Sequence, residues 1–392
     1  MSDNQREAGT IVLDPTHASF SPQEGVNDLG ATHFIGIGGA GMSVLAEMLH
    51  EQGVEVDGSD REPSAKTDRL QGIGITVEFG QRAENVEGKH TVVFSSAIKS
   101  DNPEIVAAHA AGKRIVHRSD ILALLMNGKR AVTVAGAHGK TTTSSMLSHI
   151  LVNAGADPSY AIGGFIQGPD GTTLDGGHAG KGDILVAEAD ESDGSFAKYH
   201  PTIAIITNCE ADHLDHYSGL DEIRAKFKEF MGQVPDEGVV VVCNDDPTLV
   251  ELARSTGKRV VTYGEVEGAD SRVLSWKANG VGSLFTLELP DGTRVEGSVK
   301  QNPGRHNVLN AAGCLTLLWA LGEDVEAASR ALAAFAGVRR RFDLVGVADG
   351  VTVVDDYAHH PTEIRATLKA ARNIPHNRLW CLFQPHTYTR TM

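Results

Sequence analysis

Cysteine is scarce in this chain of 392 residues. The four cysteines are Cys209, Cys243, Cys314 and Cys381, and no two of them stand in CxxC spacing. This pattern disfavours a disulfide framework and a cysteine-based zinc site, because both need clustered thiols. We therefore expect buried, reduced thiols and a cytoplasmic protein.

The sequence also lacks long apolar runs and an excess of basic residues. No run approaches the roughly 18 apolar residues that a membrane-spanning helix needs. Residues 1–30 show neither the basic start nor the apolar core of a secretory signal, and we expect them to form a flexible tail. The formal net charge of -16 disfavours binding to nucleic acid or to an anionic membrane, because both need a basic footprint. Phosphate ligands must then be held by local sites.

Alternating strand-like and helix-like segments predict an α/β protein of three domains. A βαβ pattern begins near the start of residues 31–126, which we assign to a first domain. A short polar segment at residues 127–130 separates it from a second system of strands and helices at residues 131–337. That second domain includes alternating strands around residues 271–300. Residues 338–392 begin a third domain.

The third domain is predicted to contain one strand, helix, strand unit. The strands are expected at residues 351–356 and 378–383, and the helix at residues 361–372. One crossover unit cannot easily bury both faces of its strands. We therefore interpret this domain as incomplete in the sequence.

The strongest local motif is GAHGKTT at residues 136–142, between a predicted strand and a predicted helix. Glycines let backbone N–H groups curl around phosphate oxygens, while lysine supplies positive charge and threonine a magnesium ligand. The segment departs from the full phosphate-loop pattern because Val134 stands five residues before Gly139. A chance turn is the alternative, which the flanking strand and helix disfavour. We predict a phosphate-binding loop.

A second glycine motif, GIGGAG at residues 36–41, also follows a strand and opens a helix. Asp57 and Asp60 follow at the spacing of a ribose-binding carboxylate, so the motif alone indicates NAD. The same backbone approach suits any diphosphate, including that of a UDP-sugar. A purely structural glycine turn is a third interpretation.

Acidic and histidine residues follow two further predicted strands. In the segment EADESD at residues 188–193, only Glu188 lies close enough to its strand for a specific metal-binding role. We expect its acidic neighbours to form a solvated loop. His213, within residues 208–216, follows the next strand. Parallel strands place ligands at their carboxyl ends, so both groups are expected to converge on the phosphate loop.

Two helix starts carry further polar groups. The segment GRHNVLN at residues 304–310 precedes a helix, and by spacing alone Asn307 is a helix cap. The segment DDYAHHP at residues 355–361 lies between a strand and a helix that starts with proline. Its side chains are able to bind a nucleotide or steer an amine, so we predict a functional role there.

Taken together, eight ordered segments resemble the Mur ligase family, and within it the alanine-adding branch. They are HFIGIGGAGMS, GAHGKTTT, EADESD, ITNCEADHLDHY, GRHNVLNA, RRRF, DDYAHHPTE and FQPHTYTR. The resemblance runs from residue 31 to the end of the sequence. It implies three domains: an N-terminal Rossmann-like domain that binds UDP, a central P-loop ATPase-like domain, and a C-terminal Rossmann-like domain that binds the amino acid.

The resemblance implies an ATP-dependent ligase of peptidoglycan precursor synthesis. Its reaction would join L-alanine to the lactyl carboxylate of UDP-N-acetylmuramate through an acyl phosphate, with ATP and magnesium. Under this interpretation the first glycine motif does not bind NAD. A monomer or a weak homodimer is expected.

The resemblance also implies roles for individual residues. The UDP-sugar contacts would be Gly38, Gly39, Ala40, Gly41, Met42, Ser43, Asp60, Ser95, Ser96 and Arg118. The ATP contacts would be Gly136, Ala137, His138, Gly139, Lys140, Thr141, Thr142, His306, Asn307, Asn310, Arg341 and Asp356. Thr141 and Glu188 would hold one magnesium ion, and Glu188 with His213 a second. The candidates on the amino-acid side are Tyr357, His359 and Arg390, and the catalytic set is Lys140, Glu188, His213 and His359.

Three alternative functions stay open at this point. A sister ligase would attach a recycled peptide to the same UDP-sugar. An NAD-dependent oxidoreductase would explain only the first domain and leave the phosphate loop without a role. A non-catalytic nucleotide-sugar sensor would bind its ligand without turnover.

Overall fold

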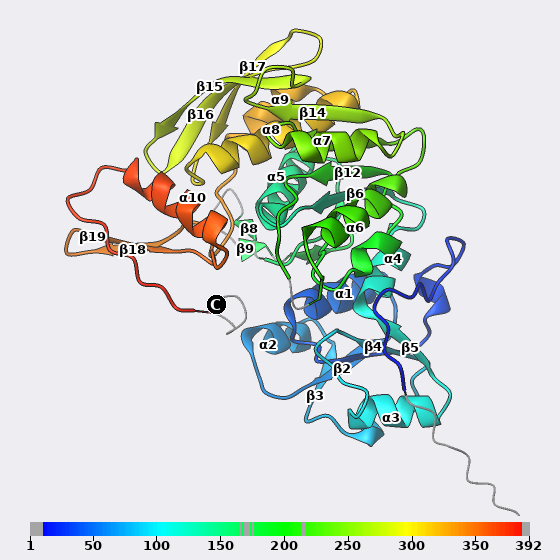
Figure 1. Cartoon of the computed structure of the whole chain (residues 1–392). Helices are drawn as coiled ribbons and strands as arrows, with labels where there is room; N and C mark the ends of the chain where they lie inside the picture. Colours follow the sequence, from blue (N-terminus) through cyan, green and yellow to red (C-terminus); the bar gives the residue numbers. More distant parts are fainter. Residues whose placement is uncertain (1–10, 165, 168–172, 175, 214–215, 386–392) are drawn as a thin grey trace, which may run out of the picture. The chain divides into compact units, whose positions relative to one another are not determined.

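The structure is a computed structural model that describes residues 11–164, 166–167, 173–174, 176–213 and 216–385 (Figure 1). The chain divides into two compact units, Met1–Asn127 and Gly128–Met392. In the described part of the chain, no helix is both long and apolar enough to cross a membrane.

The first unit is built on a five-stranded sheet with the strand order β3-β2-β1-β4-β5. Its strands are β1 (Thr32–Ile35), β2 (Val56–Asp60), β3 (Thr76–Phe79), β4 (Thr91–Phe94) and β5 (Arg114–His117). Its helices are η1 (Val26–Asp28), α1 (Ala40–Glu51), α2 (Ala65–Gly72), η2 (Ala83–Val86), α3 (Pro103–Ala110) and α4 (Arg118–Met126). All neighbouring strands pair in parallel. The carboxyl ends of these strands therefore lie along one edge of the sheet.

Residues 11–30 make defined contacts within the first unit. The backbone N–H and the hydroxyl of Ser19 each donate to the Asp120 carboxylate at 3.1 Å. The Arg114 guanidinium lies 5.1 Å from the ring centroid of Phe20. The predicted flexible tail thus includes a packed segment, whereas residues 1–10 lie outside the described residues.

The second unit is built on a ten-stranded sheet with the order β10-β7-β11-β6-β12-β13-β14-β15-β16-β17. Its strands are β6 (Arg130–Ala135), β7 (Ser159–Ala161), β10 (Gly177–His178), β11 (Ile184–Glu188), β12 (Ile203–Ile206), β13 (Val239–Cys243), β14 (Val260–Gly264), β15 (Ser271–Asn279), β16 (Gly282–Glu288) and β17 (Arg294–Val299). The strands from β7 to β15 in this order pair in parallel, and β15, β16 and β17 pair antiparallel. The short strands β8 (Ile166–Gln167) and β9 (Thr173–Leu174) form a separate pair.

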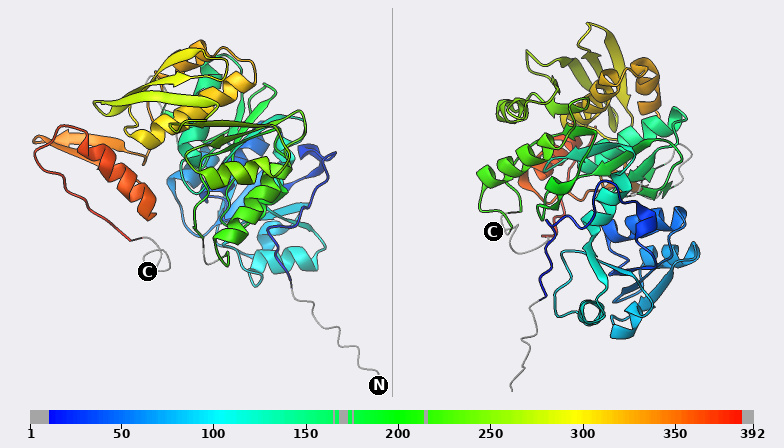
Figure 2. Two further views of the ribbon diagram at one scale, coloured as in Figure 1. Left: turned by 45° about the horizontal axis from the view of Figure 1, so that its top comes forward. Right: turned by 90° about the vertical axis from the view of Figure 1, so that its right-hand side faces the viewer.

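Helices cover the sheet of the second unit. They are α5 (Lys140–Asn153), η3 (Ser195–Lys198), α6 (Leu220–Gly232), α7 (Pro247–Arg254), α8 (Arg305–Ala320) and α9 (Val325–Leu332). Buried Val134 and Val241 of the sheet share one core with Leu147 of α5 and Leu315 of α8. Figure 2 shows strands β15–β17 in yellow beside the orange α9. The core positions the phosphate-loop segment at the carboxyl end of β6, beside the ends of β11 and β12.

The last part of the second unit contains a β-hairpin and a helix. The predicted strand at residues 351–356 is confirmed as β19 (Val351–Asp355), and the helix as α10 (Pro361–Arg372). The predicted strand at residues 378–383 is wrong, because the structure assigns no strand there. Instead β19 pairs antiparallel with β18 (Asp343–Ala348), which the sequence analysis missed.

The hairpin has a local cause. Asp349 and Gly350 join its strands with φ angles of 51° and 79°. Positive φ at both central residues is the conformation of a two-residue turn that matches the twist of antiparallel strands. The sequence pair Asp-Gly between alternating apolar residues was therefore an available signal.

Candidate functional site

The loop between β6 and α5 has the backbone of a phosphate-binding site. Gly136 and Gly139 adopt φ angles of 136° and 85°, a region that favours glycine. A Cβ atom at Gly136 would lie 2.2 Å from the Thr207 hydroxyl oxygen. Helix α5 begins directly after Gly139. Its unpaired backbone N–H groups and the positive end of its dipole favour an anion beside the loop.

Two residues after β12 hold this loop in place. The hydroxyl of Thr207 and the amide nitrogen of Asn208 donate to the His138 carbonyl oxygen at 2.6 and 2.9 Å. The Asn208 side-chain oxygen accepts the His138 backbone N–H at 3.1 Å. These anchoring roles were missed by the sequence analysis, although both residues directly follow the strand beside β6.

Lys140 is tied into the same loop. Its ammonium group donates to the Gly136 carbonyl oxygen at 2.7 Å and to the two carboxylate oxygens of Glu191 at 2.9 and 2.8 Å. Burial opposes the charged ammonium, yet the carboxylates of Glu191 and Asp190 hold the pKa of Lys140 above its ordinary value. Most of the carboxylates after Glu188 were expected to lie in a solvated loop, but Glu191 and Asp193 are buried, with exposures of 3% and 7%. The negative charge of Glu191 thus compensates the cost of burying the Lys140 ammonium group.

Glu188 and Thr141 lie together, as the predicted magnesium site requires. Glu188, the last residue of β11, accepts hydrogen bonds from the Thr141 hydroxyl at 3.1 Å and the Gly163 N–H at 2.7 Å. Burial raises the pKa of Glu188. A nearby divalent cation would favour its charged form. The two oxygen donors therefore suit a hard cation such as magnesium.

His213 lies beside Glu191 and Asp212, whereas it was predicted to share a magnesium ion with Glu188. Its Nε2 is 3.9 Å from Glu191 and 3.6 Å from Asp212. Asp190, Glu191 and His213 each offer one ligand atom, and these atoms lie within 4.8 Å of one another. The shared coordination of magnesium by Glu188 and His213 stays a prediction.

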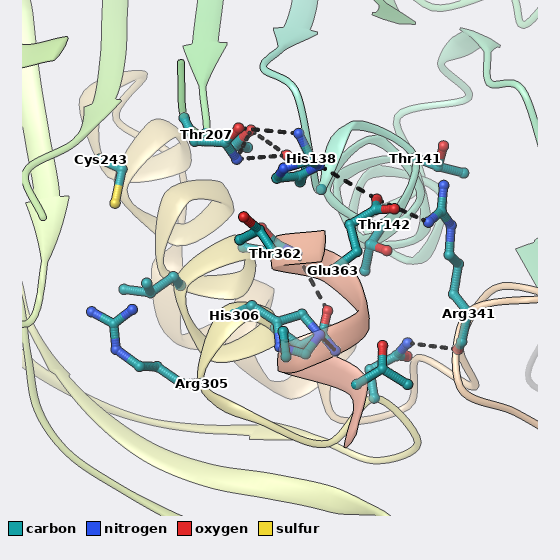
Figure 3. A pocket seen from close by; sticks show the side chains of 18 of the residues that line it. His138, Thr141, Thr142, Thr207, Cys243, Arg305, His306, Arg341, Thr362 and Glu363 are labelled. Atoms are coloured by element: carbon teal, nitrogen blue, oxygen red, sulfur yellow. Dashed lines mark hydrogen bonds and ion pairs between the residues drawn. The ribbon is translucent and has the colours of Figure 1, made fainter. Parts of the chain in front are cut away.

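A cavity of about 300 Å³ opens beside the phosphate loop (Figure 3). Its lining includes the following residues that were predicted to bind ATP: His138, Gly139, Thr141, Thr142, His306, Asn307, Asn310, Arg341 and Asp356. Gly136, Ala137 and Lys140 belong to the adjoining loop and helix start but not to the lining. The tertiary structure thus collects residues from the loop after β6, from α5 and α8, and from the segment around β18 and β19 at one cavity.

The start of α8 supplies the polar groups of one wall. Gly304 is the N-cap of this helix and Asn307 lies inside its first turn, so the predicted capping role of Asn307 is wrong. Instead, the Asn307 amide donates to Nε2 of His306 at 3.0 Å, and Asn310 donates to Asn307 at 3.3 Å. Burial lowers the pKa of His306 to about 4, which leaves its imidazole neutral near pH 7. A neutral His306 ring beside the amides of Asn307 and Asn310 suits the binding of an uncharged nucleobase.

Another part of the lining was not predicted from the sequence. Asp245 follows β13 and pairs with Arg305, which also pairs with Glu265. Cys243 and Tyr263 lie in the same lining. Burial raises the pKa of the Cys243 thiol to about 12, so this thiol is not activated as a nucleophile.

Glu363 of α10 links two walls of the cavity. Figure 3 shows it between His138 and Arg341. Its Oε1 lies 3.6 Å from His138 Nδ1 and 3.4 Å from Arg341 Nη1. Burial opposes its ionisation, but His138 and Arg341 hold the pKa of Glu363 below its ordinary value. Asp356 accepts the backbone N–H groups of Phe342 and Ala358 at 2.8 and 2.7 Å, and burial raises its pKa.

Two residues predicted for the amino-acid side, Tyr357 and His359, lie apart from the cavity lining. Nδ1 of His359 lies 2.9 Å from the Tyr357 carbonyl oxygen. The Tyr357 ring lies 4.5 Å from the Arg340 guanidinium and is 38% exposed. Neither Tyr357 nor His359 lines the cavity. Arg390 lies outside the described residues.

In the first unit, the glycine turn after β1 is closed by Asp60. The Gly38 N–H donates to the Asp60 carboxylate at 2.8 Å, and α1 starts at Ala40 with Gly39 as its N-cap. A Cβ atom at Gly41 would lie 2.9 Å from the Arg118 guanidinium, so the arginine lies against this turn.

The other predicted UDP-sugar contacts occupy the same sheet edge or the first turns of α1. Ser95 and Ser96 directly follow β4, and the Ser96 hydroxyl lies 3.1 Å from His117 Nε2. Met42 and Ser43 are buried on α1. Because the strands are parallel, their carboxyl ends bring Asp60, Ser96 and Arg118 toward one edge.

Comparisons with known proteins match three family models in order along the chain. The models are described as the Mur ligase family catalytic domain at residues 31–130, the Mur ligase middle domain at residues 134–318, and the Mur ligase glutamate ligase domain at residues 340–391. Together they span both compact units.

Among curated relatives, the UDP-N-acetylmuramate–L-alanine ligase of Bifidobacterium adolescentis is 64% identical over 416 aligned residues. This alignment covers 100% of the chain and 80% of the relative. The ligase with the same description from Thermobifida fusca is 48% identical, over 93% of the chain and 79% of the relative.

Two solved structures show the same fold. A UDP-N-acetylmuramate-alanine ligase from Thermotoga maritima has a TM-score of 0.77 and 32% identity, with 88% of this chain and 78% of that chain covered. A murein peptide ligase from Psychrobacter arcticus has a TM-score of 0.74 and 28% identity, with 88% and 76% covered.

Proposed function

This chain belongs to the Mur ligase family, and we propose that it uses ATP to join L-alanine to the lactyl carboxylate of UDP-N-acetylmuramate. The observation that carries this proposal is 64% identity, along the whole chain, to a ligase described by that reaction. The reaction belongs to peptidoglycan precursor synthesis. The four free cysteines suit the reducing cytoplasm in which we place it. We propose a monomer or a weak homodimer as the working form.

The phosphate loop and its cavity support the ATP-binding part of the proposal. The loop backbone and the start of α5 would hold the β- and γ-phosphates, with Lys140 as the positive charge. The adenosine would lie in the cavity beside His306, Asn307 and Asn310. Arg341 and Asp356 would contact the nucleotide from the segment around β18 and β19.

The donor groups beside the phosphate loop fit magnesium. Thr141 and Glu188 would hold one ion, and Glu188 with His213 would hold a second. When bound, magnesium neutralises charge on the phosphate oxygens. In this arrangement Glu191 fixes the position of Lys140 rather than touching the substrate.

The chemistry proceeds in two steps. The lactyl carboxylate attacks the γ-phosphorus of ATP, so that ADP leaves and an acyl phosphate forms. Lys140 stabilises the negative charge on the transferring group. The neutral amine of L-alanine then attacks the acyl carbon, and the tetrahedral intermediate collapses to an amide and phosphate. His359 is the proposed acceptor of the amine proton, with Tyr357 and Arg390 on the amino-acid side.

The first unit is the proposed binding site of the UDP moiety. The glycine turn before α1 brings backbone N–H groups close to a diphosphate, and Arg118 adds positive charge. The Asp60 carboxylate accepts a hydrogen bond from the Gly38 N–H of the turn. This contact supports a structural role for Asp60 in the turn rather than the binding of a dinucleotide ribose. We assign no NAD to this unit.

The alternatives have weaker support. The murein peptide ligase from Psychrobacter arcticus is 28% identical, far below the 64% of the alanine ligase relative. An oxidoreductase would leave the phosphate loop and its cavity unexplained.

The decisive experiment is a phosphate-release assay with ATP and magnesium. Release is expected only when both UDP-N-acetylmuramate and L-alanine are present. Lys140→Met, which keeps most of the length of the side chain but removes its charge, is expected to lower the rate by about a hundredfold or more. A melting curve checks that this variant is folded. Undiminished ligation by a folded Lys140→Met would refute the mechanism.

A further inference from the structure

Three potential metal ligands meet at the contact between the phosphate loop and α10. His138 belongs to the loop, Glu210 follows β12, and His360 is the N-cap residue of α10. Each offers one ligand atom, and these atoms lie within 4.8 Å of one another. The group includes none of the proposed magnesium ligands Thr141, Glu188 and His213.

His138 is the most confined member of this group. Its Nε2 lies 3.5 Å from Glu210, and its ring centroid lies 4.5 Å from that of His360. Both ring nitrogens are buried, and among the described residues neither makes a hydrogen bond; each faces a carboxylate, with Nδ1 at 3.6 Å from Glu363. Buried polar atoms without partners are costly, and each one calls for a specific explanation such as an ion. A metal ligated by the imidazole would satisfy one of these nitrogens.

The other two ligands are oriented by a neighbouring residue. The Glu210 carboxylate accepts the Thr362 hydroxyl at 2.8 Å, and Nδ1 of His360 accepts the Thr362 N–H at 3.3 Å. Hydrogen bonds of this kind orient ligating carboxylates in metal sites.

The donor set selects the kind of cation. Magnesium and calcium prefer oxygen ligands, whereas two imidazoles with one carboxylate suit zinc and related transition metals. We propose that His138, Glu210 and His360 form a binding site for a divalent transition metal, Zn²⁺, that ties the phosphate loop to the start of α10. His138 and Glu210 also line the cavity. The bound metal therefore lies at the wall of the nucleotide site.

The test measures Zn²⁺ binding to the full chain by competition with a chromophoric chelator. Saturating Mg²⁺ is present to occupy the oxygen-rich groups, and no substrate is needed. The test variant is His360→Asn, because asparagine keeps the helix cap but removes the imidazole. The matched control is His359→Asn, which changes the neighbouring histidine outside the group. We expect at least about tenfold weaker Zn²⁺ binding for His360→Asn and unchanged binding for His359→Asn.

A second measurement separates this site from the group formed by Asp190, Glu191 and His213. Zn²⁺ is expected to raise the melting temperature of the wild type and of His213→Ala, but not of His360→Asn or Glu210→Gln. Less than tenfold weakening in His360→Asn would overturn the proposal. Zn²⁺ stabilisation that disappears in His213→Ala but persists in His360→Asn would overturn it as well, and would assign the metal to the other group. Neither outcome depends on the proposed ligase activity.

Discussion

Lys140 and Glu191 form a largely buried ion pair in which both carboxylate oxygens of Glu191 accept hydrogen bonds from the one ammonium group, at 2.9 and 2.8 Å. Glu191 comes from the loop after β11, and Lys140 begins α5. The pair therefore fixes the direction of the lysine at the phosphate loop. It also makes each partner dependent on the other, because an unpaired buried charge is strongly unfavourable.

Replacing Glu191 with glutamine is expected to destabilise the second unit. The buried ammonium of Lys140 would lose its counter-charge, at a cost of about 3–5 kcal/mol in the free energy of unfolding. The double variant Lys140→Met/Glu191→Gln should be less destabilised than the sum of the single variants. Denaturant unfolding of all four proteins gives the coupling energy. Additive effects would mean that the two side chains do not interact in solution.

Gly139→Ala is expected to impair ATP binding. The backbone at Gly139 has a φ of 85°, and an added Cβ atom would lie 2.9 Å from the Asn310 side-chain oxygen. We expect at least about tenfold weaker ATP binding by calorimetry, equivalent to about 1.4 kcal/mol. Gly155→Ala is the control, since Gly155 has a similar φ of 74° but no atom near its Cβ position. The Gly155→Ala variant should lose stability but keep its ATP affinity. If both variants lost the same ATP affinity, backbone strain alone would explain the effect.

The magnesium requirement should depend on Glu188. Glu188→Gln removes the charge of a carboxylate that lies beside the Thr141 hydroxyl. We expect half-maximal ligation to need about ten to a hundred times more Mg²⁺. Thr141→Ser, which keeps the hydroxyl, should need little more than the wild type. A Mg²⁺ titration of the phosphate-release assay provides the comparison, and an unchanged requirement in Glu188→Gln would exclude it as a ligand.

The first unit should show a pH dependence that originates in buried His33. Nδ1 of His33 lies 2.7 Å from Asp57, and its Nε2 lies 3.4 Å from Glu104. Burial opposes the charged imidazole, yet these carboxylates raise the pKa of His33 above 6.5. Burial likewise opposes ionisation of Asp57, but His33 and Lys89 lower its pKa below 3.8.

The signs of these shifts define the pH window. The His33 contribution is fully present below pH 6.5 and is lost as the pH rises through its raised pKa. The Asp57 contribution is present above pH 3.8 and is lost as the pH falls through its lowered pKa. Both contributions are therefore present together between these two values. His33→Gln should flatten the fall in stability as the pH rises above 6.5, as measured by urea unfolding. An unchanged slope in the variant would show that His33 is not the titrating group.

Local sequence signals identified the phosphate loop, the strand before it and the helix after it. A β-rich run before Gly136 and a helix pattern after Lys140 are properties of neighbouring residues, so they can be read without knowledge of the fold. The Asp-Gly turn before β19 was equally local but was missed, and a strand at residues 378–383 was predicted in place of β18. Strand pairing needs a partner elsewhere in the chain, and a single apolar run does not reveal whether that partner exists.

The sequence by itself determined the kinds of chemistry available: glycines and a lysine for phosphate, carboxylates for a metal, and a family resemblance that the comparisons confirm. Only the tertiary structure decided which groups meet. In the structure Glu191 pairs with Lys140, and Thr207 and Asn208 hold the phosphate loop through hydrogen bonds. Glu363 lies between His138 and Arg341. The reason is physical: burial makes an unpaired charge or polar group costly, so packing selects partners that lie far apart in sequence.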